Sequence, residues 1–137
     1  MSHHLHRFRV PFDQLDPGGI LFYGHLFTHA HHALEALLRE IGWGLAELLA
    51  EERYRLPVVH AEADYHAPLQ LDAQIDVTVA VRHIGEHSFT LGYRFLHEEV
   101  LCATVGTAHV LVDAGNGRPT PLPEALRQAL SRYCESD

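Results

Sequence analysis

A single carboxylate, Asp16, stands in a turn of glycine and proline directly before a helical sequence pattern. The turn runs through Pro17, Gly18 and Gly19, and the helical pattern begins just after Gly24. The first turn of a helix presents backbone N–H groups that have no intrahelical acceptor, and such groups can hold a developing negative charge. The same residues also suit an ordinary turn, in which the aspartate has only a structural role. The stretch is therefore a candidate site for chemistry, with a structural alternative beside it.

Histidines follow this turn at helical spacing. His25, His29 and His32 fall on one side of the expected helix, at positions i, i+4 and i+7, while His31 lies elsewhere. Two histidines at i and i+4 can share a zinc ion, but a third protein ligand is needed, and no Asp or Glu falls within this stripe. We expect the stripe to line a pocket or an interface, or to lie on the surface, and we expect no metal site.

Other familiar mechanisms lack the residues that they need. The chain has no lysine, which excludes Schiff-base chemistry on lysine and a P-loop lysine. No Gly-x-Ser-x-Gly motif occurs, and Ser88 is the one serine well inside the chain. Cys102 falls in an apolar strand pattern, where a buried and inert thiol is the usual arrangement. Lysine, serine and cysteine nucleophiles are therefore disfavoured.

Hydrophobic periodicity predicts the elements that position Asp16. Apolar residues recur at three- and four-residue spacing from Leu26 to Ile41, which predicts an amphipathic helix that Gly42 ends. A short strand from His6 to Pro11 precedes the turn, and a short helix from Leu45 to Glu52 follows the long one. The long helix has a wide apolar face, so it must lie on a large apolar surface.

The later chain supplies this surface as a sheet. Four strand patterns follow the second helix, and the short turn-like segments between them predict an antiparallel meander. These patterns cover residues 56–65, 73–83, 88–97 and 100–112, and a C-terminal helix is expected over residues 125–133. We expect one α+β domain over residues 1–137, in which an antiparallel sheet wraps around one long central helix.

Composition limits the partners and the location. The formal net charge is -8 and no run of basic residues occurs, so a nucleic-acid partner is not expected. No run of about 18 apolar residues is present, so we expect no membrane span. Cys102 and Cys134 are the two cysteines, and no leader pattern is apparent, which predicts a cytoplasmic protein with reduced thiols.

The residues around Asp16 also fit the motif of a known family. Its pattern, Asp-x-x-Gly-(Ile/Val)-(Val/Leu)-aromatic-(Tyr/His), is matched position by position by Asp16, Gly19, Ile20, Leu21, Phe22 and Tyr23. Later landmarks of the family are matched at residues 64–68, 85–88 and 112–123. Over nearly its whole length the chain resembles the hotdog-fold acyl-CoA thioesterases of the 4-hydroxybenzoyl-CoA thioesterase type. Residues 56–61 are also similar to a segment of the 1,4-dihydroxy-2-naphthoyl-CoA hydrolases within this family.

This resemblance implies a hotdog fold and hydrolysis of the thioester of an aromatic or medium-sized acyl-CoA. It implies that Asp16 is the nucleophile or the general base on water, and that the Tyr23 backbone N–H polarises the thioester carbonyl. Substrate-binding residues are expected at Gly19, Gly24, His25, His60 and Ser88. Coenzyme A would be part of the substrate, and no metal or redox cofactor would be needed. Two subunits would pair their sheets, in a homodimer or homotetramer with active sites at the interface.

Three features of the sequence depart from the family pattern. Gln14 stands where a second acid is often found, and His25 replaces a common asparagine. A basic cluster that some members use for the coenzyme A phosphates is here Gly-Glu-His at residues 85–87, which leaves only Ser88 as a match. Contacts to the phosphates must then be sought elsewhere, among Arg53, Arg55, Arg82 and Arg94.

Two other functions suit such a fold. A hotdog dehydratase or hydratase would use a histidine and an acid in a motif that this sequence does not show. A non-catalytic module that binds acyl-CoA or acyl-carrier protein would bind the thioester tightly without releasing free thiol.

Overall fold

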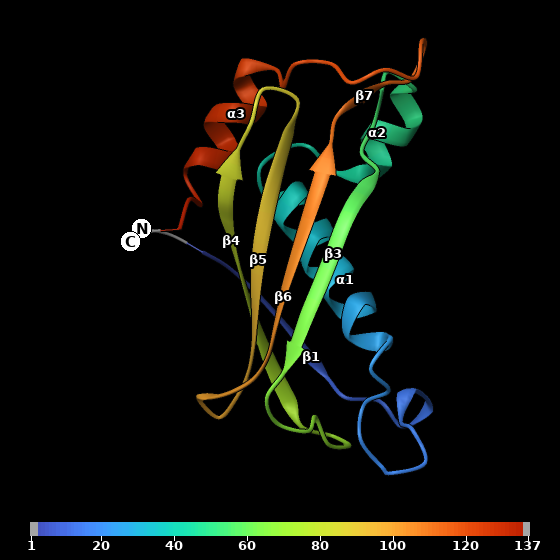
Figure 1. Cartoon of the computed structure of the whole chain (residues 1–137), viewed down its shortest axis with the longest axis vertical. Helices are drawn as coiled ribbons and strands as arrows, with labels where there is room; N and C mark the ends of the chain where they lie inside the picture. The colour runs from blue at the N-terminus through green and yellow to red at the C-terminus, as the bar shows by residue number, and fades with distance from the viewer. Residues whose placement is uncertain (1–2, 136–137) are drawn as a thin grey trace.

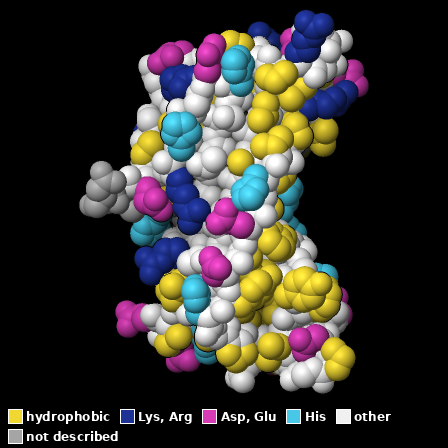
Figure 2. All heavy atoms as spheres, in the orientation of Figure 1, with side chains coloured by type: hydrophobic (Ala, Val, Ile, Leu, Met, Phe, Trp, Pro, Cys, Tyr) yellow, Lys and Arg dark blue, Asp and Glu magenta, His cyan; other side chains and the backbone are white. Residues whose placement is uncertain are grey.

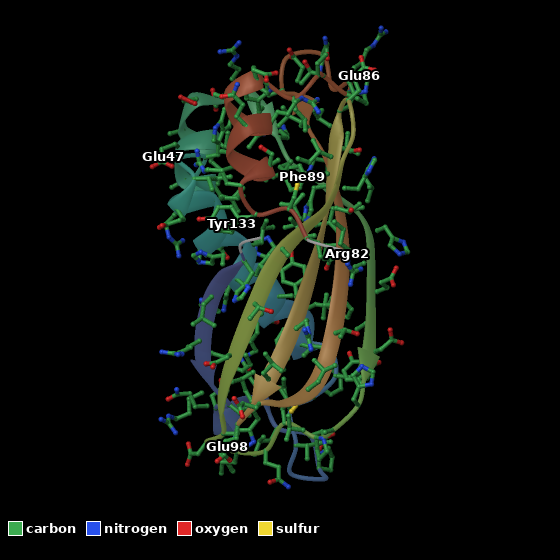
Figure 3. All side chains as sticks on the ribbon, turned by 90° about the vertical axis from the view of Figure 1, so that its left-hand side faces the viewer. Glu47, Arg82, Glu86, Phe89, Glu98 and Tyr133 are labelled. Carbon is green, nitrogen blue, oxygen red and sulfur yellow. The ribbon has the colours of Figure 1, made fainter. Side chains whose placement is uncertain are left out.

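One antiparallel sheet curves around one long helix in the computed structural model, which describes residues 3–135 (Figure 1). The strand order is β1-β4-β5-β6-β3, and every neighbouring pair is antiparallel. The strands are β1 (His4–Arg9), β3 (Val58–Tyr65), β4 (Gln74–Ile84), β5 (Ser88–His97) and β6 (Val100–Val110). The side view shows the helices on one side of the sheet (Figure 3). The predicted α+β architecture is confirmed.

The core lies between the inner face of the sheet and the helix. Alternate residues of a strand point to one face, so Ile75, Val77, Val79 and Val81 of β4 face the helix. The inward-facing apolar residues of β4 and β5 are fully or almost fully buried. They include Ile75, Val77, Val79, Val81, Phe89, Leu91, Tyr93 and Phe95. The half-buried pattern that the sequence predicts for this strand is therefore confirmed.

Helix α1 (His25–Glu40) lies in the hollow of the sheet and begins one residue before the predicted start. Its apolar face buries Leu26, Ala30, Ala33, Leu34, Leu37 and Leu38. Gly42 ends the helix with a φ of 85°, in the left-handed region that favours glycine. The Trp43 N–H donates to the Leu38 carbonyl at 2.8 Å, and the Gly42 N–H donates to the Arg39 carbonyl at 3.2 Å. These two bonds form a Schellman cap.

The predicted four-stranded meander is wrong at β3. Only β4, β5 and β6 follow one another in space as in sequence, whereas β3 pairs with β6 at the far edge of the sheet. The chain reaches β4 from β3 by crossing the end of the sheet through residues 66–73. There Leu69 is buried, and its carbonyl accepts a hydrogen bond from the Leu21 N–H at 2.8 Å. The crossing segment thus packs on the loop that carries Asp16.

A smaller sheet stands beside the first one. The strand predicted over residues 100–112 ends at Val110, and the chain then forms β7 (Val112–Asp113), which pairs with β2 (Tyr54–Arg55). Helix α2 (Leu45–Glu51) precedes β2, and α3 (Glu124–Ser131) packs near β4 with Leu126, Ala129 and Leu130 buried. No helix of residues 3–135 is long and apolar enough to cross a membrane.

Strand β4 is paired from both ends of the described chain. The register of β1 reaches His4 opposite Val79. Beyond that point the Val81 N–H donates to the Tyr133 carbonyl at 2.8 Å, and the Glu135 N–H donates to the Val81 carbonyl at 2.8 Å. The C-terminal segment therefore continues the edge that β1 leaves open.

Candidate active site

The Asp16 carboxylate is held by its own turn. Its Oδ1 atom accepts hydrogen bonds from the Gly18 N–H at 2.8 Å and the Ile20 N–H at 3.3 Å. The Gly19 N–H donates to the Asp16 carbonyl at 3.0 Å, and Gly19 adopts a φ of 82°, which a residue with a side chain rarely takes. The structural and the chemical roles predicted for Asp16 are therefore compatible. Its Oδ1 atom fixes the loop, while Oδ2 forms no hydrogen bond with residues 3–135.

Backbone hydrogen bonds tie this loop to the rest of the molecule. A short 3₁₀ helix, η1 (Phe12–Gln14), leads into the loop, and the Phe22 N–H donates to the Gln14 carbonyl at 2.9 Å. Leu15 and Leu21 form an isolated bridge across the base of the loop. Asp16 is therefore on a short loop whose two ends are closed, so its position relative to α1 is constrained.

The start of α1 supplies unpaired donors next to the loop. The His25 N–H donates to the Phe22 carbonyl at 2.9 Å, but the N–H groups of Tyr23 and Gly24 have no acceptor in the part of the chain that the structure describes. A Cβ at Gly24 would lie 2.9 Å from Cε2 of the Phe22 ring, so a larger residue there would displace that exposed side chain. Two free amides at the positive end of a helix can stabilise an oxyanion.

An apolar cleft of about 270 Å³ opens beside the helix start. Its walls come from the Asp16 loop, the start of α1 and the chain that follows β3. They are Ile20, Leu21, Tyr23, Leu26, Tyr65, His66, Ala67, Pro68 and Leu69. The Tyr65 hydroxyl donates to the Tyr23 carbonyl at 2.8 Å and so fixes the backbone on which the free amides lie. Tyr23 lines this cleft in the single subunit, and the Asp16 side chain lies outside its lining.

The histidines of α1 divide between two roles. His25 is half-buried at the helix start, with its ring edge against Phe22 and Nδ1 3.4 Å from Thr28 Oγ1. His29 is 5% exposed and stacks on Phe8 with ring centroids 3.6 Å apart. His32 is exposed. The stripe therefore consists of one buried residue, His29, between two more accessible ones. The three side chains do not together line one pocket.

His29 also joins the helix to the Asp16 loop, a contact that sequence reasoning missed. Its Nε2 atom lies 2.7 Å from Gln14 Oε1, while Nδ1 has no partner within the described chain. Burial lowers the pKa of His29 to about 4, with a smaller contribution from the nearby charges of His32, His25 and His6. The neutral ring then donates its one proton to Gln14 through Nε2. The sequence contained one indication that His29 is buried: it lies one turn beyond Leu26 on the apolar face of the helix.

Two predicted substrate-binding residues lie away from this loop within one subunit. His60 lies on β3, with Nε2 2.9 Å from Glu62 Oε1, and both side chains are largely exposed. Ser88 begins β5 beside the β4–β5 turn, where its carbonyl accepts from the Gly85 N–H at 2.7 Å. That turn is at the opposite end of the sheet from the Asp16 loop (Figure 1). The chain thus brings together Asp16, Gly19, Tyr23, Gly24 and His25, without His60 or Ser88.

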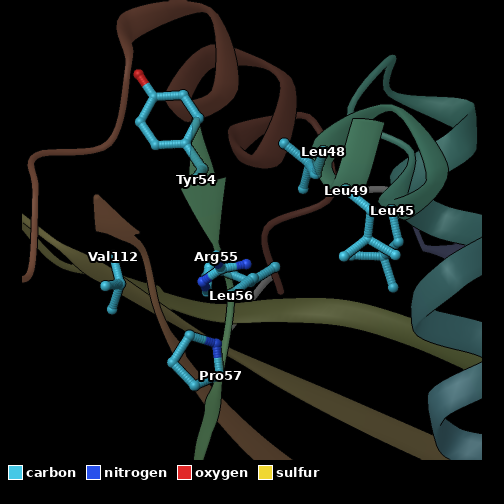
Figure 4. A pocket seen from close by; sticks show the side chains of 8 residues that line it. All are labelled: Leu45, Leu48, Leu49, Tyr54, Arg55, Leu56, Pro57 and Val112. Atoms are coloured by element: carbon cyan, nitrogen blue, oxygen red, sulfur yellow. The ribbon is translucent and has the colours of Figure 1, made fainter. Parts of the chain in front are cut away.

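The four candidate arginines do not form one cluster. Arg53 lies 5.0 Å from the ring centre of Tyr54, and Arg94 is exposed on β5. Arg55 lines a cleft of about 400 Å³ among leucines of α2 (Figure 4). Helix α2 lies at the opposite end of the molecule from the Asp16 loop (Figure 1). Arg82 lies over the facing glycines Gly92 and Gly106, where an added Cβ would meet its guanidinium group.

Comparison with known proteins identifies the family of this chain. The sequence profile of the Thioesterase-like superfamily matches residues 10–130. A 1,4-dihydroxy-2-naphthoyl-CoA hydrolase from Microcystis aeruginosa is 28% identical over 127 residues, which are 88% of this chain and 92% of the relative. The crystal structure of a 1,4-dihydroxy-2-naphthoyl-CoA thioesterase from Synechocystis has a TM-score of 0.88 at 23% identity and covers 95% of this chain and 96% of its own. A gentisyl-coenzyme A thioesterase has a TM-score of 0.83 at 26% identity, with 93% and 98% covered.

Proposed function

Because the chain belongs to the thioesterase-like superfamily, we propose that it hydrolyses the thioester bond of aromatic acyl-CoA substrates. The observation that carries the proposal is the Asp16 loop, which holds a carboxylate beside a helix start where two amides have no acceptor among residues 3–135. Relatives named as hydrolases of 1,4-dihydroxy-2-naphthoyl-CoA and gentisyl-CoA support an aromatic acyl group. Coenzyme A enters as part of the substrate, and the proposed chemistry needs no metal or redox cofactor.

In the proposed reaction the thioester carbonyl oxygen accepts hydrogen bonds from the Tyr23 N–H, with the Gly24 N–H beside it. Asp16 Oδ2 takes a proton from water, whose oxygen attacks the carbonyl carbon, and the negative charge develops on the oxygen held by the amides. The tetrahedral intermediate then expels the coenzyme A thiolate, which takes up the proton from Asp16. In the nucleophilic alternative, Oδ2 itself attacks the carbonyl carbon, the thiolate leaves, and water hydrolyses the resulting anhydride.

A panel of coenzyme A thioesters tests this function. We expect wild-type protein to release free thiol from benzoyl-CoA and naphthoyl-CoA with a higher kcat/KM than from straight-chain acyl-CoA, because the cleft at the helix start is walled by aromatic and aliphatic side chains. A thiol-trapping dye measures the release. Tight binding of these thioesters without thiol release would instead identify a binding module, and conversion of an enoyl-CoA would identify a hydratase.

We further propose that two subunits pair through β3. Its outer edge carries the eight residues Val58–Tyr65, and no strand of residues 3–135 covers it. Val58, Val59 and Tyr65 are 48%, 59% and 48% exposed, and Figure 2 shows hydrophobic side chains gathered along this side of the molecule. An exposed edge strand of this length is a template for pairing with another chain. Such a dimer would bring a second subunit to the cleft, because Tyr65 ends β3 and contacts Tyr23.

A charge on this edge should separate the subunits. We expect Val59→Asp to weaken dimerisation by at least about tenfold, since each subunit would bury an unpaired carboxylate in the strand pair. Val100→Asp is the matched control, because Val100 is a valine of similar exposure, 57%, on a different strand. Sedimentation equilibrium measures both. A monomeric wild type at tens of micromolar, or equal effects of the two substitutions, would contradict pairing through β3.

A further inference from the structure

The Tyr65 side chain reaches from the end of β3 to the start of α1. Its hydroxyl donates to the Tyr23 carbonyl at 2.8 Å, although the two residues are 42 positions apart in the sequence. Tyr65 is the last residue of β3, and it forms part of the wall of the cleft beside the helix start. A side chain from the edge of the sheet therefore holds one peptide group of the turn that opens the helix.

That peptide group also carries one of the two amides that have no acceptor among residues 3–135. The Tyr23 carbonyl and the Gly24 N–H belong to the same planar peptide unit, and in a trans unit these two groups point in opposite directions. The carbonyl points along the helix, where it also accepts from the Leu26 N–H. The Gly24 N–H therefore points back out of the helix start, and the bond from Tyr65 fixes its direction.

The two amides are held in different ways. The first amide, the Tyr23 N–H, shares its peptide unit with the Phe22 carbonyl, which accepts from the His25 N–H at 2.9 Å. The peptide unit of the second amide accepts a longer bond of 3.3 Å within the turn, from the Leu26 N–H. The 2.8 Å bond from Tyr65 is the shorter of the two bonds to that carbonyl. The helix start thus holds the first amide by itself, whereas the second depends on Tyr65.

The Tyr65 hydroxyl is suited to this role at neutral pH. Burial, with a smaller contribution from Tyr23, raises the pKa of Tyr65, so the phenol keeps the proton that it donates. A carbonyl that accepts a hydrogen bond becomes more polarised, and hydrogen bonds in a chain strengthen one another. The bond from Tyr65 therefore makes the Gly24 N–H, at the other end of the same peptide unit, a stronger donor.

We propose that Tyr65 is a positioning residue of the oxyanion site, which aims and strengthens the Gly24 N–H for the oxygen of the tetrahedral intermediate. The inference rests on the proposed thioesterase function and assigns a role in it to a side chain that acts through the backbone. The negative charge on that oxygen develops only during the reaction, so the bond stabilises the transition state more than the bound substrate. Loss of the hydroxyl should therefore lower kcat and leave KM nearly unchanged.

Tyr65→Phe tests this role, because it removes the hydroxyl and keeps the ring in the cleft wall. We expect kcat for naphthoyl-CoA to fall about tenfold while KM stays within about twofold of the wild-type value. The fall should be smaller than the hundredfold or more that follows removal of an oxyanion donor, because the Gly24 N–H itself remains. Steady-state thiol release measures both constants.

Tyr54→Phe is the matched control. It removes a phenol hydroxyl from β2, outside the cleft at the helix start, so both kinetic constants should stay within about twofold of wild type. An unchanged kcat in Tyr65→Phe would overturn the positioning role. A loss of kcat/KM that lies mainly in KM would also overturn it, because the hydroxyl would then serve substrate binding.

The Gly24 amide resonance tests the same bond in the free protein, without any reaction. In ¹⁵N-labelled protein, Tyr65→Phe should shift this resonance, whereas Tyr54→Phe should leave it in place. A wild type that hydrolyses no thioester would reject the proposed function, and the resonance would still show whether Tyr65 controls the amide. An unchanged Gly24 resonance in Tyr65→Phe, with hydrolysis by the wild type, would reject the positioning role and keep the proposed function.

Discussion

Asp16→Asn lowers kcat for aromatic acyl-CoA hydrolysis by at least about a hundredfold, the range expected for a positioned acid or base. The asparagine side chain keeps an oxygen that can accept from the Gly18 and Ile20 amides, so the turn is preserved. It cannot take a proton from water or attack a carbonyl as a carboxylate does. The free energy of unfolding should therefore stay close to the wild-type value while turnover is lost, which steady-state kinetics and urea denaturation measure together.

Two companion variants sharpen this result. Asp16→Ala should lose the same turnover and also about 1 kcal/mol of stability, because the turn loses its side-chain acceptor. Asp13→Asn, an exposed carboxylate in η1, should leave kcat within about twofold of wild type, since it lies outside the turn. Near wild-type turnover in Asp16→Asn would remove Asp16 from the mechanism. Single turnovers in ¹⁸O water would separate the two routes, because only the nucleophilic route can label the Asp16 carboxylate.

The second large effect is a loss of stability in mild acid, which two buried histidines cause. His29 and His109 are 5% and 0% exposed, and burial lowers the pKa of each from 6.5 to about 4. A folded-state pKa below the unfolded value means that the unfolded chain binds the proton first. Each histidine therefore contributes stability that is fully present above pH 6.5 and is lost as the pH falls toward 4. The loss is about 3 kcal/mol for each ring.

Urea denaturation at several values between pH 7.5 and 4 measures this loss. Two such rings together represent a large fraction of the 5 to 15 kcal/mol that a typical domain has, so the midpoint should fall steeply. His29→Phe, which keeps the stack on Phe8, should remove about half of the pH dependence. His60→Gln is the control, because His60 is largely exposed. Equal stability of the wild type at pH 7.5 and pH 4.5 would contradict buried neutral histidines.

Sequence patterns correctly predicted the elements whose structure depends on residues close together in the chain. The central helix, its glycine end and the Asp16 turn depend on residues within a few positions of one another, and each is present. The place of β3 in the sheet was not predictable in this way. It depends on whether β6 or β4 is the better partner for the strand, a choice made by packing across the whole domain.

The same limit applies to the site. The contact between His29 and Gln14 joins residues 15 apart, and the chain between them had to turn before it could form. Ser88 and His60 were inferred from a family pattern, and a single subunit keeps both away from Asp16. If two subunits share each site, residues of both contribute to it, and the spacing within one chain carries no information about their distance.

The pairing of β4 from both ends of the chain has a consequence for folding. The Val81 backbone groups bond to Tyr133 and Glu135, while Val79 lies opposite His4, so segments near both ends of the described chain pair with one strand in its middle. Contacts of such high sequence separation are made late and slow the folding of a domain. Until residues 133–135 dock, the end of β4 remains an open strand edge, and a nascent or truncated chain is exposed to aggregation at that position.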